Sequence, residues 1–216
     1  MKIFSVRSVP STKWSSDKPL NFSPKPITIF ILCLGLFLFG LGESLIITAS
    51  VGMSPWTVLA EGLSITTGLS IGTLTFLISL GVLLLWIPLK QQAGIGTILN
   101  AIIVAAVIEW SLPYLPHPET YAMQILQAVL GTLIVGVASG IYQIANLGPG
   151  PRDGLMTGCQ KATGLPIAWV RVFLEIVVIT IGWTLGGTVG IATVIFAIGV
   201  GPAVSMGLYL IASISK

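Results

Sequence analysis

The residues best able to do chemistry in this chain are charged side chains that interrupt long apolar segments. Glu43 lies within one such segment, and Arg171 and Glu175 lie within another. Charges are costly inside a bilayer, and those that occur there often bind ions or substrates. No basic residue lies within one helical turn of Glu43. An unpaired carboxyl at that depth favours its protonated form, which makes Glu43 a candidate proton carrier.

Each of these residues also has a structural interpretation. Arg171 and Glu175 stand four positions apart on one predicted helix, so they can form an ion pair, and Arg171 can extend to the cytoplasmic surface. Glu43 could instead reach water at the outer face. At 1.5 Å per residue, Glu175 is about 12 Å and Glu43 about 24 Å from the inner end of its own helix. The two carboxyls therefore need not touch.

A second group of candidates surrounds two prolines, in Ser54-Pro55-Trp56 and in Gly150-Pro151-Arg152-Asp153. Both segments have the composition of a helix start, and Gly68 and Gly164 are placed to end the two helices. A helix of about 13 residues is near 20 Å long, too short to cross a bilayer. The sequence leaves open whether these helices are re-entrant or interfacial.

The two short helices could bind an anion or could be purely structural. Free N–H groups at helix starts attract negative charge, and Arg152 would strengthen that attraction, so the two starts could face one anionic group from opposite sides. Alternatively, the glycines and prolines form only a tight entry into each helix. Arg152 and Asp153 would then be a local ion pair at the cytoplasmic surface.

No catalytic or metal-binding motif is recognisable. The single histidine, His117, lies between two prolines, and Cys33 and Cys159 do not have the spacing of metal ligands. A Gly-Lys-Ser/Thr phosphate loop is absent from the sequence. We therefore expect no enzyme activity, no metal ion and no cofactor.

The elements that must position these residues are membrane helices. The chain has 216 residues, of which 54% are apolar and 8% charged, and its mean hydropathy is +0.99. A soluble domain carries about 25% charged residues. Five of the ten basic residues precede the first apolar run, so the net charge of +3 is a topology signal rather than a sign of nucleic-acid binding.

We predict an all-α polytopic membrane protein with a disordered tail over 1–26 and a membrane domain over 27–216. Six apolar runs are long enough to cross a bilayer, and they cover residues 27–49, 71–89, 94–112, 121–147, 167–186 and 190–213.

The basic residues predict a multi-pass protein with both termini in the cytoplasm. The loops 50–70, 113–120 and 187–189, assigned to the outside, contain no Lys or Arg. The loops assigned to the inside contain Lys90 and, further on, Arg152 with Lys161. This distribution follows the positive-inside rule.

The sequence also contains an internal repeat at a constant offset of 96 residues. Pro55 matches Pro151, and Thr67-Gly68-Leu69 matches Thr163-Gly164-Leu165. Repeat 1 covers about 27–112 and repeat 2 about 121–213. Because each holds three predicted spans, the second copy must cross the membrane in the opposite sense, which is the inverted-topology arrangement of many secondary transporters.

The glycine- and proline-rich motifs resemble the YczE/YitT-like family of bacterial integral membrane proteins. The resemblance is carried by Gly52-Met53-Ser54-Pro55-Trp56, by the run from Gly148 to Met156 that contains Gly-Pro-Arg-Asp, and by Gly164, Arg171, Glu175 and Gly186-Gly187-x-x-Gly190. It implies a bacterial plasma-membrane location. Family members are treated as permeases or as membrane accessory proteins, without defined site residues.

Two functional hypotheses follow. The first is a secondary-transporter-like permease for a small solute that could be anionic. The second is a non-transporting scaffold or accessory protein that supports a partner enzyme or complex. The expected partners are the lipid bilayer, an unknown small solute, and either a second copy of the chain or another membrane protein. Polar residues that converge on a midplane cavity would favour transport.

Overall fold

The computed structural model describes residues 11–214, with side chains up to residue 211. This part of the chain is all-helical and contains no strand, which confirms the prediction of an all-α protein. Its elements are α1 (Pro26–Thr48), α2 (Pro55–Thr67), α3 (Ile71–Trp86), α4 (Ile95–Ser111), a 3-10 turn η1 (Leu112–Tyr114), α5 (Tyr121–Ile144), α6 (Pro151–Thr163), α7 (Ile167–Thr184) and α8 (Ile191–Ile214).

Glycine and proline set the limits of the short helices α2 and α6. Pro55 and Pro151 stand at their first positions, where a missing N–H removes no helical hydrogen bond. Gly68 and Gly164 follow their last residues with φ of 74° and 72°. This left-handed conformation ends a helix and costs glycine little.

Within the described residues, five helices are long and apolar enough to cross a membrane: α1, α4 with η1, α5, α7 and α8. The pair α2–α3 would raise this number to six, but its two helices meet at a bend of 114°. The helix α3 has 16 residues and ends at Trp86, three residues before the predicted end of that span. The chain turns at this point, and Lys90 has a positive φ of 51°.

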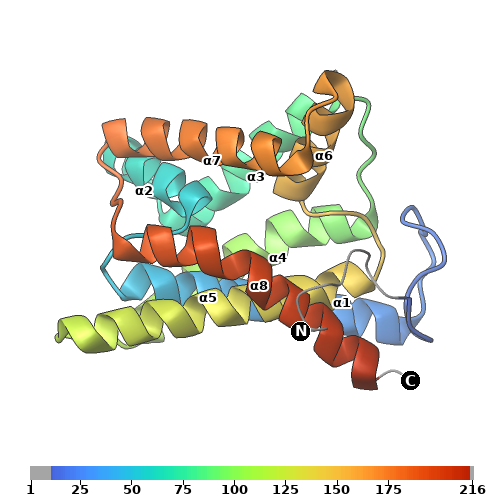
Figure 1. Ribbon diagram of the computed structural model, residues 1–216, viewed down its shortest axis with the longest axis horizontal. Helices are drawn as coiled ribbons and strands as arrows, with labels where there is room; N and C mark the ends of the chain where they lie inside the picture. The colour runs from blue at the N-terminus through green and yellow to red at the C-terminus, as the bar shows by residue number, and fades with distance from the viewer. Residues whose placement is uncertain (1–10, 215–216) are drawn as a thin grey trace.

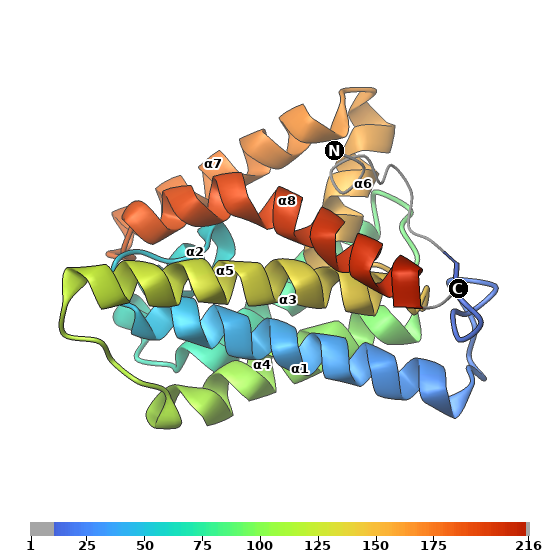
Figure 2. The ribbon, with the colours of Figure 1, turned by 60° about the horizontal axis from the view of Figure 1, so that its bottom comes forward.

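The long helices form a bundle with both antiparallel and parallel neighbours, since α4 runs in the same direction as α1, and α8 in the same direction as α5. In Figures 1 and 2, α1 and α5 lie side by side and antiparallel, with α4 along α1 and α8 along α5. The helices α3 and α7 form a second layer. Figure 1 shows α2 and α6 near opposite ends of this bundle. The first turn of α1 and the last turns of α8 lie at the α6 end.

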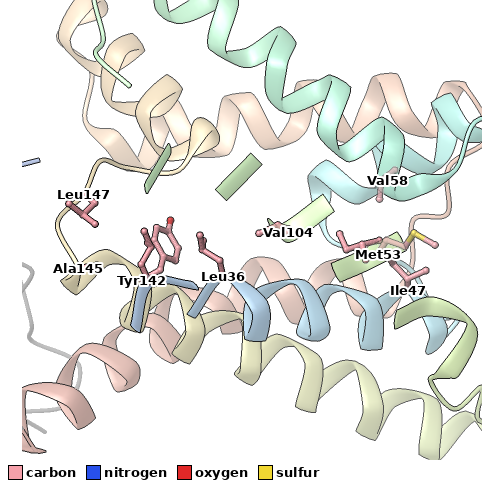
Figure 3. Close-up of a cluster of buried hydrophobic side chains, with 10 residues drawn as sticks. Leu36, Ile47, Met53, Val58, Val104, Tyr142, Ala145 and Leu147 are labelled. Atoms are coloured by element: carbon pink, nitrogen blue, oxygen red, sulfur yellow. The ribbon is translucent and has the colours of Figure 1, made fainter. Parts of the chain in front are cut away.

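The apolar core follows the length of α1. Figure 3 shows a cluster that extends from Ala145 and Leu147 at one end, past Leu36, to Met53 at the other. Glycines let helices approach closely outside this cluster, as is common between membrane helices. A Cβ on Gly154 of α6 would lie 2.0 Å from the Trp86 ring of α3. Trp86 also donates a hydrogen bond from Nε1 to the Pro151 carbonyl at 3.0 Å.

Part of the predicted tail makes contacts with the bundle. The N–H of Ser16 donates to the Ala145 carbonyl at 3.0 Å, and the Asn146 amide donates to the Ser16 carbonyl at 2.8 Å. Residues 1–10, including Lys2 and Arg7, lie outside the described residues. The disorder expected for residues 1–26 stays a prediction of the sequence.

The close approach of α2 and α7 generates a stability prediction. A Cβ on Gly182 would lie 2.6 Å from the backbone of Leu59, whereas a Cβ on Gly81 would meet nothing within 4 Å. The Gly182→Ala change should therefore lower the free energy of unfolding by about 1–3 kcal/mol, the usual cost of overpacking. Gly81→Ala is the matched control and should be neutral or stabilising by about 0.5–1 kcal/mol. Reversible unfolding in mixed detergent micelles measures both, and equal stabilities would contradict the packing.

Candidate functional site

A cavity of about 590 Å³ lies inside the bundle. Residues from all eight α-helices of the described chain and from the turn before α6 line it, among them Phe39 of α1, Trp56 of α2 and Asn100 of α4. A second hollow of about 600 Å³ shares Gln143, Asp153 and Arg171 with it. This second hollow also touches Pro19, just before α1. The cavity therefore continues toward the end of the bundle where α1 begins.

The starts of the two short helices meet in this cavity. The guanidinium carbon of Arg152 lies 5.3 Å from the centroid of the Trp56 ring. Such cation–π contacts contribute about 0.5–2 kcal/mol, with the larger values where water is excluded. Trp56 directly follows Pro55 and Arg152 directly follows Pro151, so each residue belongs to the first turn of its helix.

The other charged residues of the cavity have close partners. The Tyr142 hydroxyl of α5 donates to Asp153 at 2.5 Å. Arg171 donates from Nε to Glu175 at 2.8 Å, which is the ion pair expected from their spacing. It is also the one ion pair found within residues 11–211. Arg152 is the cationic group of the cavity that has no carboxylate within ion-pair distance.

Glu43 lies beside the cavity in a buried cluster of hydroxyls. The Ser54 and Thr57 hydroxyl oxygens lie within hydrogen-bond distance of its Oε2, at 2.7 and 2.9 Å. The Glu43 side chain is 1% exposed, and its Oε1 has no hydrogen-bond partner in the described part of the chain. When ionised, its carboxylate would attract the Arg152 guanidinium. In this structure Glu43 is therefore turned into the protein rather than toward outer water.

Two further buried polar atoms of the cavity wall lack partners among the described residues. They are Nε1 of Trp56 and Oγ1 of Thr75. An indole N–H can only donate a hydrogen bond, whereas a hydroxyl can donate and accept. Together with the Arg152 guanidinium, these atoms offer a bound molecule mainly donors and positive charge. The arrangement suits a small polar or anionic solute.

The structure brings most of the sequence candidates together at one site. Trp56, Pro151, Arg152, Asp153, Arg171 and Glu175 line the cavity. Pro55 and Glu43 lie behind its wall, since Pro55 precedes Trp56 and Glu43 binds Ser54 and Thr57. Sequence reasoning missed Tyr142, Thr57 and Thr75, which are uncharged residues that each carry a hydroxyl group. Their positions in the sequence could have indicated them, because each is a polar side chain within an apolar segment or near the start of a helix.

Comparison with known proteins places these observations in a family. Residues 26–207 match the model of a family of unknown function, DUF6198. An uncharacterized protein of Haemophilus influenzae is 40% identical over 207 residues, which cover 96% of this chain and 94% of that protein. The uncharacterized membrane protein YczE of Bacillus subtilis is 32% identical over 168 residues, covering 76% of this chain and 77% of that protein. No solved structure matches the chain.

The family match covers every described helix up to the middle of α8, and the similarity to YczE agrees with the resemblance seen in the glycine- and proline-rich motifs. The long apolar helices agree with the identification of YczE as a membrane protein. The chain is therefore an integral membrane protein that belongs to the YczE-like DUF6198 family.

Proposed function

We propose that this protein is a secondary transporter that moves a small anionic solute across the bacterial plasma membrane. The observation that carries the proposal is the cavity between the starts of α2 and α6, with Arg152 exposed to it and without an ion-pair partner. A packed interior would have favoured the rival scaffold or accessory role. A polar cavity within a membrane bundle is instead what a permease requires.

The arrangement of the helices supports an inverted repeat. The two short helices begin and end at equivalent positions, because α2 (Pro55–Thr67) and α6 (Pro151–Thr163) are offset by 96 residues at both ends. A hydrogen bond between the halves also occurs twice. The Gly96 N–H donates to the Leu147 carbonyl at 2.7 Å, and their equivalents 96 positions away make the reverse contact, in which the Ala192 N–H donates to the Val51 carbonyl at 2.9 Å. This exchange is what a two-fold axis between halves produces. We infer that the two halves cross the membrane in opposite senses.

The cavity contains equivalent residues from both halves. Six pairs of its lining residues differ by 96 positions, and they are Phe39 with Val135, Trp56 with Arg152, Thr75 with Arg171, Ser79 with Glu175, Asn100 with Phe196, and Val104 with Val200. A site built from matched positions lies on the pseudo-symmetry axis. Inverted-repeat transporters bind their substrates at such a repeat interface.

The two halves differ in how closely equivalent helices pack, and one of these differences supports alternating access. The helix α3 packs along α4, whereas the equivalent helices α7 and α8 hardly touch. Figure 2 shows α7 and α8 diverging from their shared loop. In the packed half, a Cβ on Gly72 would lie 2.8 Å from the Ala105 carbonyl. The equivalent residues are Ala168 and Gly201, and a Cβ on Gly201 would meet nothing within 4 Å.

We propose that the transporter has a second state, in which the close packing of α3 on α4 and the separation of α7 from α8 are exchanged. The helix α7 would dock on α8 with Ala168 against Gly201, and α3 would separate from α4. The cavity would close at the α6 end and open at the α2 end. Small residues at both contacts permit the close approach that such docking needs.

The orientation of the protein can be tested with single cysteines in a background lacking Cys33 and Cys159. His117 and Lys161 are both exposed, in the loop before α5 and on α6. With cytoplasmic termini, as the basic residues indicate, His117→Cys should react with an impermeant maleimide added outside intact cells, and Lys161→Cys should react only after lysis. The reverse pattern would contradict the orientation.

A second test asks whether the helices α7 and α8 must close. Gly201→Leu places a side chain where Ala168 would dock, and its Cβ would meet nothing within 4 Å in the present state; Gly81→Leu, whose Cβ is equally free, is the matched control. Untargeted metabolomics of a strain lacking the protein identifies the solute whose level changes. The wild type and Gly81→Leu should restore that level, and Gly201→Leu should not restore it despite normal membrane amounts.

The same strain and solute test the binding site. Arg152→Ala should weaken uptake of an anionic solute into proteoliposomes at least tenfold, because one desolvated charge-assisted hydrogen bond contributes about 1.5–3 kcal/mol. Uptake of a neutral solute should change less. If purified protein moves no solute, and a partner protein co-purifies instead, the accessory role is the correct one.

A further inference from the structure

We propose that Glu43, Ser54 and Thr57 form a proton-binding site, and that this proton is the coupling ion for the solute. The proposal rests on the proposed transport function and adds its coupling ion. The three residues come from the last turns of α1 and the start of α2. All three are buried, with exposed fractions of 1% each. A carboxyl with this degree of burial must be neutral or well paired.

The three side-chain oxygens form a closed triangle. Glu43 Oε2 lies 2.7 Å from Ser54 Oγ and 2.9 Å from Thr57 Oγ1, and the two hydroxyl oxygens are 2.9 Å apart. Every side of the triangle has hydrogen-bond length. Three hydrogen bonds need three protons, but the two hydroxyls supply only two. A proton on Glu43 supplies the third, so that each oxygen donates one bond and accepts one.

An ionised Glu43 fits this geometry poorly. Both hydroxyls would point at the carboxylate, which leaves two hydroxyl oxygens 2.9 Å apart with no proton between them. Oε1, which has no partner among the described residues, would then share a negative charge without a donor. An unsatisfied charged atom in the interior costs more free energy than an unsatisfied neutral carbonyl oxygen. The structure thus corresponds to the protonated form.

The same distances distinguish a proton from a metal cation. A sodium ion held by these oxygens would lie between them and keep them further apart than hydrogen-bonded oxygens. The triangle instead has the spacing of direct hydrogen bonds on all three sides. This spacing is the one that a bound proton requires.

Arg152 is the charged group that connects Glu43 to the cavity. An ionised Glu43 would attract the Arg152 guanidinium, as Asp153 does, and Asp153 is in turn bound by the Tyr142 hydroxyl of α5. The other carboxyls on neighbouring helices have separate contacts. Glu61 of α2 accepts hydrogen bonds from Thr188, and Glu109 of α4 lies against Gly72 of α3.

This connection fixes the sign of the coupling. A proton on Glu43 removes a negative charge that would otherwise compensate Arg152, so the guanidinium attracts a solute anion more strongly. By linkage, a bound anion raises the affinity of Glu43 for its proton by the same factor. Proton and anion therefore bind together and cross the membrane in the same direction.

Infrared spectroscopy of the full chain in lipid tests the bound proton without a known solute. We expect a carbonyl-stretch band of a protonated carboxyl group at neutral pH that is lost completely in Glu43→Gln. The matched control, Glu61→Gln, should keep it. Thr57→Val keeps the carboxyl but removes one hydroxyl, so the band should remain and move to higher frequency. This second variant keeps the test decisive if Glu43→Gln does not fold.

Buffers with sodium or potassium separate the two coupling ions. A band that is the same in both salts supports the proton. Loss of the band in sodium alone would show a sodium site, and no Glu43-dependent band in either salt would show an ionised carboxyl; both results overturn the proposal. If the band is present while Gly201→Leu still restores the solute level, the proton site stands but its coupling role and the transport mechanism fail.

Discussion

Irregular backbone in an apolar environment must find hydrogen-bond partners, and the architecture depends on how this chain supplies them. The chain breaks between α1 and α2 and again between α5 and α6. In the first break the Val51 carbonyl accepts from the N–H of Ala192, at the start of α8, and in the second the Leu147 carbonyl accepts from the N–H of Gly96, at the start of α4. Each break is thus bound by a helix start from the other half, whose N–H groups lack partners within their own helix.

The position of the charged residues follows from these two anchored breaks. Because each break is held in place, the helices that follow begin inside the bundle at Pro55 and Pro151, and Trp56 and Arg152 meet in its interior. The polar residues nearby complete the arrangement, with Tyr142 bound to Asp153 and two hydroxyls bound to Glu43. The cavity, its cation and the buried carboxyl are thus consequences of one backbone arrangement that occurs twice.

The sequence predicts the parts of this account that depend on local chemistry. Prolines and glycines fix the bounds of α2 and α6, and the spacing of Arg171 and Glu175 predicts their ion pair. The contacts that require tertiary packing could not be predicted. Nothing in the neighbourhood of Glu43 shows that Ser54 and Thr57 fold back onto it, and no local pattern shows that α3 packs on α4 while α7 stays apart from α8. The predicted span 71–89 is too long because hydropathy does not register the turn after Trp86.

Electron paramagnetic resonance distances between paired spin labels test most directly whether the two halves exchange one packing arrangement. Ile176 and Ile198 are exposed on α7 and α8, and their equivalents Leu80 and Ile102 are exposed on α3 and α4. In liposomes each pair should show two distances, one for each state of the protein. The short α7–α8 distance and the long α3–α4 distance belong to the same state, so they should occur in equal fractions. Gly201→Leu should remove both of these populations together. A single distance for each pair, unchanged by Gly201→Leu, would contradict the account.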